Sequence, residues 1–367
     1  MAARRIVRYA VVGLGHIAQV AVIPAFTHAR RNSKLVSIVS GDRTKRREIA
    51  TRYRVQHAFG YDGYDECLSG VDAVYIALPN SMHAEYAIRA ARAGVHVLCE
   101  KPMAVTVDEC REMIAAARKA RVKLMVAYRL HFEAVNLAAI DIARRGDLGD
   151  LKFFNSSFSM KVRRGDIRTK RAYGGGTLYD IGVYCINAAR NLFRAEPTEV
   201  SAVSINSGVA ALAEIDETTA ATLRFGNDHV ATFITSFNAA DVGAFRIVGT
   251  KGELHADPAY EYAEGLEFTL TVDGKTTRKK TGKRDQFAPE LLYFSDCILE
   301  DRAPEPSGEE GLQDVRIVQA LYESSRIGKP VKIRPFKKHR RPTGRQRITR
   351  PGVRKPALIK VQSASQD

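Results

Sequence analysis

Long hydrophobic runs and cysteine pairs are both missing from this chain of 367 residues. No apolar run approaches the roughly 18 residues that a membrane-spanning helix needs, so we expect no membrane span. The five cysteines lie far apart without a Cys-x-x-Cys pair, which predicts free thiols in a reducing compartment, no disulfide and no structural metal. Arg4-Arg5 is similar to a twin-arginine export start, but the apolar residues after it lead into a glycine loop. We therefore expect a cytoplasmic protein.

Acidic residues are scarce mainly in one part of the chain. The formal net charge of +16 by itself suggests a nucleic-acid or membrane partner. From Lys329 onward, however, thirteen Lys and Arg face a single acid, Asp367, and the preceding chain is nearly balanced. Residues 334–367 also lack apolar periodicity, which predicts a disordered basic tail. Such a tail would make only weak, salt-dependent contacts with nucleic acid.

The length and the apolar content of 45% are enough for two domains. Strand-like and helix-like segments alternate over the first 130 residues, which predicts an α/β domain with a doubly wound parallel sheet. After Gly149 the β-rich segments are separated by turns and predict an α+β domain with a large open, mostly antiparallel sheet. We place the domains at residues 1–130 and 131–333, followed by the tail, 334–367. The late helices expected at 289–299 and 311–327 are candidates to pack back on the first domain.

The first expected strand, residues 6–12, runs directly into Gly13-Leu14-Gly15-His16-Ile17-Ala18. A G-x-G-x-x-G/A motif between a strand and an apolar helix is the fingerprint of dinucleotide binding in a Rossmann domain. The first glycine allows a tight turn, and the second lets the main chain approach a pyrophosphate. Gly13, Gly15, His16 and Ile17 are therefore candidate cofactor residues.

The residues after the second expected strand, 35–39, bear on the choice between the two nicotinamide cofactors. An acid at this point would bind the ribose 2′-hydroxyl and repel a 2′-phosphate, but Ser40 stands in its place and Gly41 follows. Arg43 and Lys45 could bind a phosphate, although Asp42 keeps NAD open. We expect NADP, with NAD as the alternative. The alternative is that the basic side chains belong to the solvated first turn of the next helix, namely Arg43, Lys45, Arg46 and Arg47.

Glu100-Lys101-Pro102 follows a short buried strand, residues 95–99. Ligands of parallel sheets bind beyond the carboxyl ends of the strands, so Lys101 is expected to face the reactive end of a nucleotide. The tripeptide alone would equally suit a charged strand end before a turn. Leu78, Asn80, His83 and Glu100 are further cofactor candidates at such strand ends, although His83 also suits a packing role at a helix start.

Arg129 and His131 follow the strand expected at 123–127 and, with Tyr128, are candidates to hold the substrate. The alternative is a surface arginine and a packed histidine.

Asp180 and Tyr184 are four residues apart on the helix expected at 177–193. Both side chains should therefore project from one face of the helix, one turn apart, where they could flank a substrate hydroxyl. Helix capping by the aspartate and core packing by the tyrosine are the plainer alternatives. The Gly174-Gly175-Gly176 triplet just before them indicates either a close approach of the main chain to another group or a flexible turn.

The chain resembles the glucose-fructose oxidoreductase, inositol dehydrogenase and rhizopine-catabolism (Gfo/Idh/MocA) family over about residues 5–333. The motifs are specific when taken together: Gly13-x-Gly15-x-x-Ala18, Pro79-Asn80-x-x-His83, Val97-Leu98-Cys99-Glu100-Lys101-Pro102, Tyr128-Arg129-x-His131-Phe132, and Gly174-Gly175-Gly176 with Asp180-Ile181-Gly182-Val183-Tyr184. The resemblance implies a Rossmann domain, a second domain with a large open antiparallel sheet, a nicotinamide cofactor, and a sugar, cyclitol or related alcohol as substrate.

The resemblance also implies the catalytic residues. It places the family's catalytic lysine and aspartate on Lys101 and Asp180 and the third catalytic group on Tyr184, where many members have histidine. A tyrosine there is similar to the glucose-fructose oxidoreductase and dihydrodiol dehydrogenase branches, which argues against an inositol dehydrogenase. The same branches again suggest NADP.

Oxidation of a sugar hydroxyl requires a base, and both Tyr and Lys have an ordinary pKa near 10. A charged Lys101 beside Tyr184 would lower the pKa of the phenol, so we expect Tyr184 to be the acid/base and Lys101 its electrostatic partner. Asp180 would then orient the sugar. The opposite assignment, with Lys101 as the base, stays open.

Two other functions suit the same scaffold. One is a dehydrogenase acting on a dihydrodiol or dicarbonyl substrate instead of a sugar. The other is a nucleotide-sensing regulator without catalytic activity, whose basic tail contacts nucleic acid. In each case an open sheet face rarely stays bare, so we expect a homodimer or homotetramer formed through that face.

Overall fold

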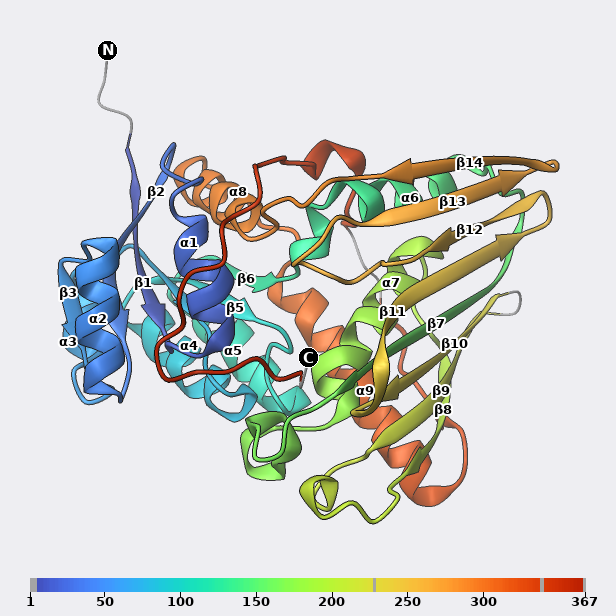
Figure 1. Cartoon of the computed structure of the whole chain (residues 1–367), viewed down its shortest axis with the longest axis horizontal. Coiled ribbons are helices and arrows are strands. Elements are labelled where there is room, and N and C mark those ends of the chain that lie inside the picture. The colour runs from blue at the N-terminus through green and yellow to red at the C-terminus, as the bar shows by residue number, and fades with distance from the viewer. Residues whose placement is uncertain (1–4, 227–228, 337–339, 366–367) are drawn as a thin grey trace. The chain divides into compact units, whose positions relative to one another are not determined.

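A computed structural model of the chain describes residues 5–226, 229–336 and 340–365. These residues form two compact units (Figure 1). The first unit comprises the chain up to Arg129 together with residues 285–312 and 349–363. The second comprises residues 130–284 and 313–348 and the end of the chain from residue 364. The units therefore do not follow the three consecutive ranges that the sequence suggests.

The first unit is built on a parallel sheet of six strands in the order β3-β2-β1-β4-β5-β6. The order reverses direction between β1 and β4, which marks the point where doubly wound sheets bind nucleotides. The expected doubly wound sheet is thus confirmed. Its strands are β1 (Val7–Val12), β2 (Ser33–Val39), β3 (His57–Phe59), β4 (Ala73–Ile76), β5 (His96–Glu100) and β6 (Leu124–Ala127).

Helices cover this sheet, and one of them comes from late in the chain. Helix α8 packs on the strands β1 and β2: Tyr9 and Ser295 share a hydrogen bond of 2.8 Å between hydroxyls, and Asn32 donates to the Leu292 carbonyl at 2.9 Å. The helices are η1, a π-helical segment (Ala18–Val22), α1 (Ile23–Ala25), α2 (Arg43–Tyr53), α3 (Tyr64–Ser69), α4 (His83–Arg92), α5 (Val107–Lys119) and α8 (Ala288–Leu299).

The second unit contains a sheet of nine strands in the order β14-β13-β12-β11-β7-β10-β9-β8-β15. Among the described strands of this sheet, only β7 and β10 pair in parallel, so the expected mostly antiparallel sheet is confirmed. The strands are β7 (Leu151–Lys161), β8 (Glu199–Ile205), β9 (Thr218–Phe225), β10 (His229–Ser236), β11 (Asn238–Gly249), β12 (Gly252–Ala256), β13 (Glu267–Val272), β14 (Lys275–Lys280) and β15 (Val331–Lys332).

Alternation along the strands gives this sheet two different faces. In β9, for example, Leu223 and Phe225 are buried, whereas Arg224 between them is exposed. Helix α9 packs on the buried side, where the Ser324 hydroxyl accepts a hydrogen bond from the Ala202 amide at 3.1 Å. The helices of this unit are α6 (Ala134–Arg145), η6, a π-helical segment (Leu178–Gly182), α7 (Val183–Leu192) and α9 (Gly308–Ile327), whose first turn belongs to the other unit. The opposite face exposes large apolar side chains from β7, β8, β10 and β11: Phe153, Val203, Ile205, Val230, Ile234 and Val242.

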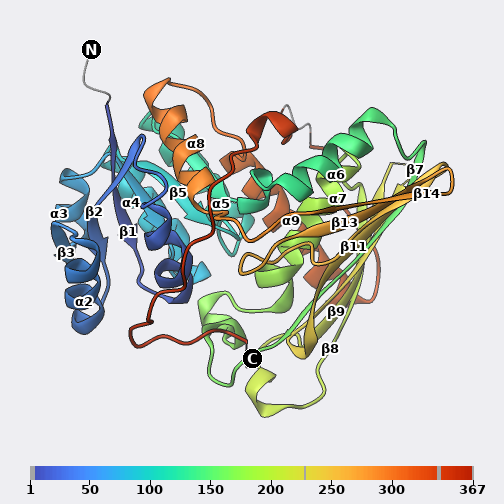
Figure 2. The ribbon, with the colours of Figure 1, turned by 45° about the horizontal axis from the view of Figure 1, so that its top comes forward.

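The structure corrects the expectation of a disordered tail over residues 334–367, as far as the described residues 340–365 are concerned. Ile359 and Ala364 are buried, and the Arg341 guanidinium binds Glu196 at 2.8 Å within the second unit. Within the first unit, the red segment passes beside α1 in both views (Figures 1 and 2). The composition predicts disorder because isolated apolar residues such as Ile359 show no periodicity. The tail is held instead by hydrogen bonds of its main chain to the folded units, and such bonds require no sequence pattern.

Several elements were not expected from the sequence. Strand β14 contains no apolar residue and is largely exposed at the edge of its sheet, so hydrophobic alternation could not reveal it. Helix α6 and the short strands β3, β12 and β15 were also not predicted. None of the helices in the described residues is long and apolar enough to cross a membrane.

Candidate active site

The glycine loop after β1 has the geometry that a bound pyrophosphate requires. Gly13 has a φ of +96°, and a Cβ added to it would lie only 2.4 Å from the Ala77 carbonyl oxygen at the end of β4. A Cβ added to Gly15 would instead meet nothing within 4 Å. Gly13 thus packs the loop against the sheet, and Gly15 leaves open space beside the main chain. His16 and Ile17 follow in the same turn and are half-buried. These residues fit a dinucleotide.

The end of β2 holds the residues expected to choose the cofactor. Ser40 is buried and its hydroxyl accepts a hydrogen bond from the Asp42 amide at 3.3 Å. Asp42 caps α2, because its carboxylate accepts from the Lys45 amide at 3.0 Å. That hydrogen bond, together with the charge of Lys360, holds the pKa of Asp42 below its usual value. Arg43 is exposed on the first turn of α2, and Lys45 is half-exposed.

Lys101 comes directly after β5 and is half-buried. Its neighbour Glu100 accepts a hydrogen bond of 2.7 Å from the Tyr75 hydroxyl. Burial raises the pKa of Glu100, although the charge of Lys101 acts in the opposite direction. The peptide bond between Lys101 and Pro102 is cis.

His83 is buried at the start of α4, and its ring connects the ends of two strands. Nδ1 lies 2.9 Å from the Pro102 carbonyl and Nε2 lies 2.9 Å from the Leu78 carbonyl. Burial lowers the pKa of His83, and the charge of Lys101 contributes in the same direction. These contacts favour the packing role for His83: the ring joins the residue after the candidate lysine to the segment that follows β4. Asn80 lies close by in the 3-10 turn that precedes α4.

Arg129 and Tyr128, both expected to hold a substrate, are buried. Within the first unit, the Arg129 guanidinium donates to the side-chain oxygen of Gln286. Burial raises the pKa of Glu290 on α8, and the positive charge of Arg129 acts against this rise. The guanidinium is thus engaged inside the first unit, and a role in substrate binding stays a prediction.

Asp180 and Tyr184 are set apart from their neighbours by their exposure. Over residues 176–187, only Asp180 and Tyr184 are half-buried, and every other residue is buried. The two lie four residues apart where η6 continues into α7, so the spacing places them on one face. The Tyr184 ring lies 5.6 Å from that of Phe158 and 5.9 Å from that of Tyr260.

Arg168 is a partner of Asp180 that the sequence did not reveal. Its Nε donates to Asp180 Oδ2 at 2.7 Å, and its NH1 donates to Asp166 Oδ1 at 3.2 Å. Burial alone would lower the pKa of Arg168, but the two carboxylates raise it. No motif marks this arginine, because the contact depends on how the segment before Gly174 folds back.

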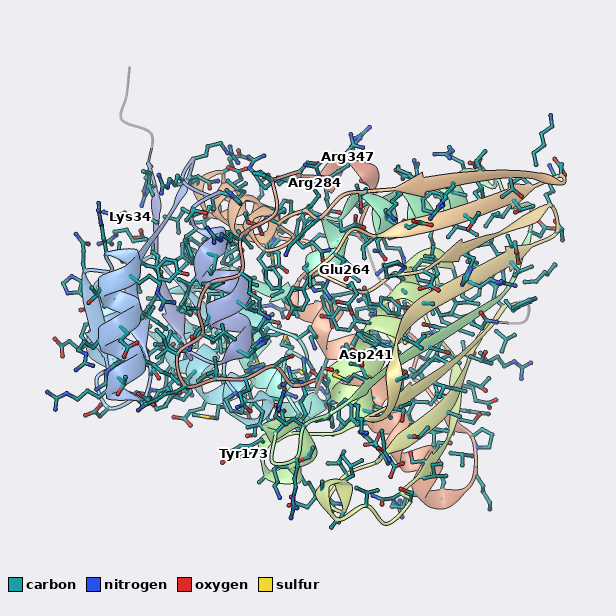
Figure 3. The ribbon with its side chains drawn as sticks, viewed as in Figure 1. Lys34, Tyr173, Asp241, Glu264, Arg284 and Arg347 are labelled. Carbon is teal, nitrogen blue, oxygen red and sulfur yellow. The ribbon has the colours of Figure 1, made fainter. Side chains whose placement is uncertain are left out.

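The glycine triplet explains how that segment folds back. A Cβ on Gly175 would lie 2.3 Å from the Arg168 carbonyl oxygen, and a Cβ on Gly176, whose φ is +128°, would lie 2.4 Å from the Tyr322 hydroxyl. The Gly176 amide also donates to the Arg168 carbonyl at 3.0 Å. The triplet therefore serves close packing, which brings Arg168 to the start of the helix that carries Asp180. Tyr173, labelled in Figure 3, lies on the same segment and is exposed.

His131 is buried in a polar network of the second unit. Its Nε2 lies 2.8 Å from the Asn187 side-chain oxygen, and Asn187 in turn donates to Asp314 at 2.9 Å. The structure thus favours the packed histidine, and a substrate contact by His131 stays a prediction. The candidate residues are divided between the units: Lys101 and the glycine loop belong to the first, and Asp180, Tyr184 and His131 belong to the second.

Comparison with known proteins matches both parts of the chain. Residues 7–128 match the model of an oxidoreductase family with an NAD-binding Rossmann fold, and residues 137–255 match that family's GFO/IDH/MocA C-terminal domain. An uncharacterised oxidoreductase of Rhizobium meliloti is 37% identical over 88% of this chain and 98% of its own length. This chain belongs to the Gfo/Idh/MocA family. The predicted resemblance is confirmed.

Other members of the Gfo/Idh/MocA family with known activities are also similar to this chain. The NADP+-dependent D-xylose 1-dehydrogenase of Haloarcula marismortui is 29% identical over 89% of this chain and 93% of its own. The crystal structure of the aldose-aldose oxidoreductase of Caulobacter crescentus superposes with a TM-score of 0.86, at 35% identity over 90% of this chain and 100% of that one. The chain is therefore an oxidoreductase with a nicotinamide cofactor, and these two relatives are named for activity on sugars.

Proposed function

We propose that this protein is an NADP-dependent oxidoreductase acting on a hydroxyl group of a sugar or related polyol, with Lys101, Asp180 and Tyr184 as its catalytic group. The observation that carries the proposal is the exposure pattern over residues 176–187, where only the carboxylate of Asp180 and the phenol of Tyr184 lie in half-buried positions. Such a pair on an otherwise buried helix is arranged for contact with a ligand rather than for packing.

When bound, a nicotinamide cofactor would supply the acceptor for the hydride that leaves the sugar carbon, and the residues of this chain would handle the proton and orient the sugar. Tyr184 takes the hydroxyl proton as general base and returns it in the reverse reaction. Lys101 donates a hydrogen bond to the same oxygen, and its positive charge stabilises the negative charge that develops on that oxygen. Asp180 accepts a hydrogen bond from a sugar hydroxyl, and its ion pair with Arg168 holds the carboxylate in one orientation.

The preference for NADP is supported by the residues after β2. Ser40 occupies the place where an acid would repel a 2′-phosphate, and Arg43 and Lys45 stand on the first helical turn beyond it. The similar xylose dehydrogenase of Haloarcula marismortui uses NADP+.

Initial rates with a panel of aldoses, polyols and trans-diols, each with NADP+ and NAD+, test this proposal. We expect turnover of at least one aldose with NADP+, and the purified protein with Lys101→Met should lose it while retaining its affinity for NADPH. The exposed Lys119 on α5 supplies the control, since Lys119→Met removes the same charge away from the candidate site. Full turnover by the Lys101 variant would refute its role, and activity on diols alone would favour the dihydrodiol alternative.

We also infer that copies of the chain associate through the outer face of the nine-stranded sheet. Phe153, Val230 and Ile234 expose apolar side chains there on the neighbouring strands β7 and β10, and Val203 does so on β8, beyond β9. Light scattering should give the mass of a dimer or tetramer, and Val203→Lys with Ile234→Lys should reduce it to that of the monomer. The five separate thiols support a cytoplasmic location.

A further inference from the structure

The C-terminal segment of the first unit lies against the helices that follow β1 and β2. Residues 349–363 belong to this unit, and both views show the red segment passing beside α1 (Figures 1 and 2). We call residues 357–360 of this segment the strap. The Ala357 carbonyl accepts a hydrogen bond from the Arg52 guanidinium on α2 at 2.5 Å.

Gln19 anchors the strap to the helix that starts at the glycine loop. Its side-chain Nε2 donates to the Ile359 carbonyl at 3.0 Å, and the Ile359 amide donates to its Oε1 at 2.8 Å. Nε2 also donates to the Leu14 carbonyl, inside the glycine loop, at 3.0 Å. Gln19 and Ile359 are both buried. The strap is therefore tied to the loop that would receive the pyrophosphate.

This anchoring delivers the next residue, Lys360, to the end of β2. Its Nζ lies 3.6 Å from Asp42 Oδ2 and donates to the Thr44 hydroxyl at 3.1 Å. Lys360 has a φ of +49°, a conformation that costs free energy for any residue with a Cβ and that persists only where surrounding contacts impose it. Asp42 and Thr44 occupy the turn where dinucleotide-binding domains distinguish a ribose 2′-hydroxyl from a 2′-phosphate.

We propose that Lys360 binds the 2′-phosphate of NADP and that the strap completes the cofactor site from the far end of the chain. The proposal rests on the NADP preference proposed above. A phosphate monoester at this turn carries a charge of about −1.5 to −2, and Asp42 would repel it. Lys360 already sits beside Asp42, so its ammonium offsets that repulsion and offers a hydrogen-bond donor at the same point. Its exposed side chain keeps the freedom to turn from Asp42 to a phosphate.

Calorimetric binding of two probes without a nicotinamide ring tests the role of Lys360. Adenosine 2′,5′-bisphosphate and adenosine 5′-monophosphate differ only in the 2′-phosphate, so the ratio of their dissociation constants isolates that group. Lys360→Gln should weaken the bisphosphate about tenfold, the usual size of one lost charge-assisted hydrogen bond, and leave the monophosphate within about twofold. Lys355→Gln, an exposed lysine of the same segment, should leave both constants unchanged.

Adding Asp42→Asn to Lys360→Gln should restore part of the bisphosphate affinity, because the repulsion is removed and asparagine still caps α2. If Lys360→Gln alters thermal stability but not the ratio, Lys360 serves only to hold the tail and the inference is overturned. If the wild-type protein does not prefer the bisphosphate over the monophosphate, the proposed NADP preference itself is wrong. If the wild-type protein does prefer the bisphosphate and Lys360→Gln leaves the ratio of the two dissociation constants unchanged, only the role of Lys360 is wrong.

Discussion

Arg168 and Asp180 form an ion pair in which Nε donates to Oδ2 at 2.7 Å, while only 30% and 14% of their side-chain surfaces are exposed. The same guanidinium binds Asp166 at 3.2 Å, so one arginine joins two carboxylates. The planar guanidinium of arginine can bind two carboxylates with little loss of side-chain freedom, whereas the ammonium group of lysine acts as a single point charge. The orientation of the candidate sugar-binding carboxylate thus depends on a residue outside every sequence motif.

Replacing Arg168 with lysine should therefore disturb the sugar site without disturbing the cofactor. We expect Arg168→Lys to lower kcat/KM for the sugar by about 10- to 100-fold, the effect of one charged hydrogen bond, with the Kd of NADPH unchanged. Steady-state kinetics and fluorescence titration would measure the two effects. Arg164→Lys, at an exposed position on the same segment, is the control. Equal losses in both variants would contradict a specific role for Arg168.

Tyr184→Phe separates the phenol from the aromatic packing. The ring contacts with Phe158 and Tyr260 remain possible, so the protein should fold as before. We expect kcat for sugar oxidation to fall by at least about 100-fold and its pH profile to change, since the group that takes the proton is gone. A variant with the wild-type pH profile would rule out the phenol as the acid/base.

The two glycines of the nucleotide loop should respond differently to alanine. Gly13→Ala forces a Cβ to within 2.4 Å of the Ala77 carbonyl oxygen at a positive φ, so it should lower the free energy of unfolding of the apoprotein by about 1–3 kcal/mol. Gly15→Ala meets no protein atom within 4 Å and should leave that stability unchanged while weakening NADPH binding. Urea unfolding and fluorescence titration would measure the two effects. Equal stability losses would show that the loop packs differently.

The buried Glu290 should make stability depend on pH. Burial raises its pKa well above the model-compound value of 4.5, and the negative charge of Glu100 adds to this, against the opposing charge of Arg129. The folded protein therefore holds a proton that the unfolded chain releases above about pH 4.5, so stability falls as the pH rises. Urea unfolding between pH 5 and 8 should show this slope, at most about 1.4 kcal/mol per pH unit. Glu290→Gln should flatten it, and an unchanged slope would assign the pH dependence to other groups.

The fully buried ion pair between Arg190 and Asp314 should be costly to break. The two groups lie 2.5 Å apart with no exposed side-chain surface. Asp314→Ala removes one of the two carboxylates that pair with the buried guanidinium, the other being Glu196 at 2.7 Å, and should lower the free energy of unfolding by about 3 kcal/mol. The exposed pair of Arg111 and Asp108 gives the comparison, because Asp108→Ala should cost less than about 1 kcal/mol. Similar unfolding midpoints for the two variants would contradict this assignment.

Much of the first unit follows from local patterns in the sequence. A strand buried on both faces reads as a continuous apolar run, and Gly13 and Gly15 occur where a strand meets a helix, so each feature depends on residues close together in the chain. The same holds for Asp180 and Tyr184, whose spacing of four residues alone predicts a shared helix face. These local regularities were enough for the fold class and for the family.

Tertiary structure alone decided the contacts between distant segments. Arg168 meets Asp180 because a glycine triplet lets two main-chain segments approach closely, and Ile359 meets Gln19 although 340 residues separate them. A single ion pair, or two hydrogen bonds between the Gln19 side chain and the Ile359 main chain, leaves no periodic pattern in the sequence. The composition of the tail predicts disorder because the tail has too few apolar residues to form a core of its own. Composition does not show whether another part of the fold offers a surface to which the tail can bind.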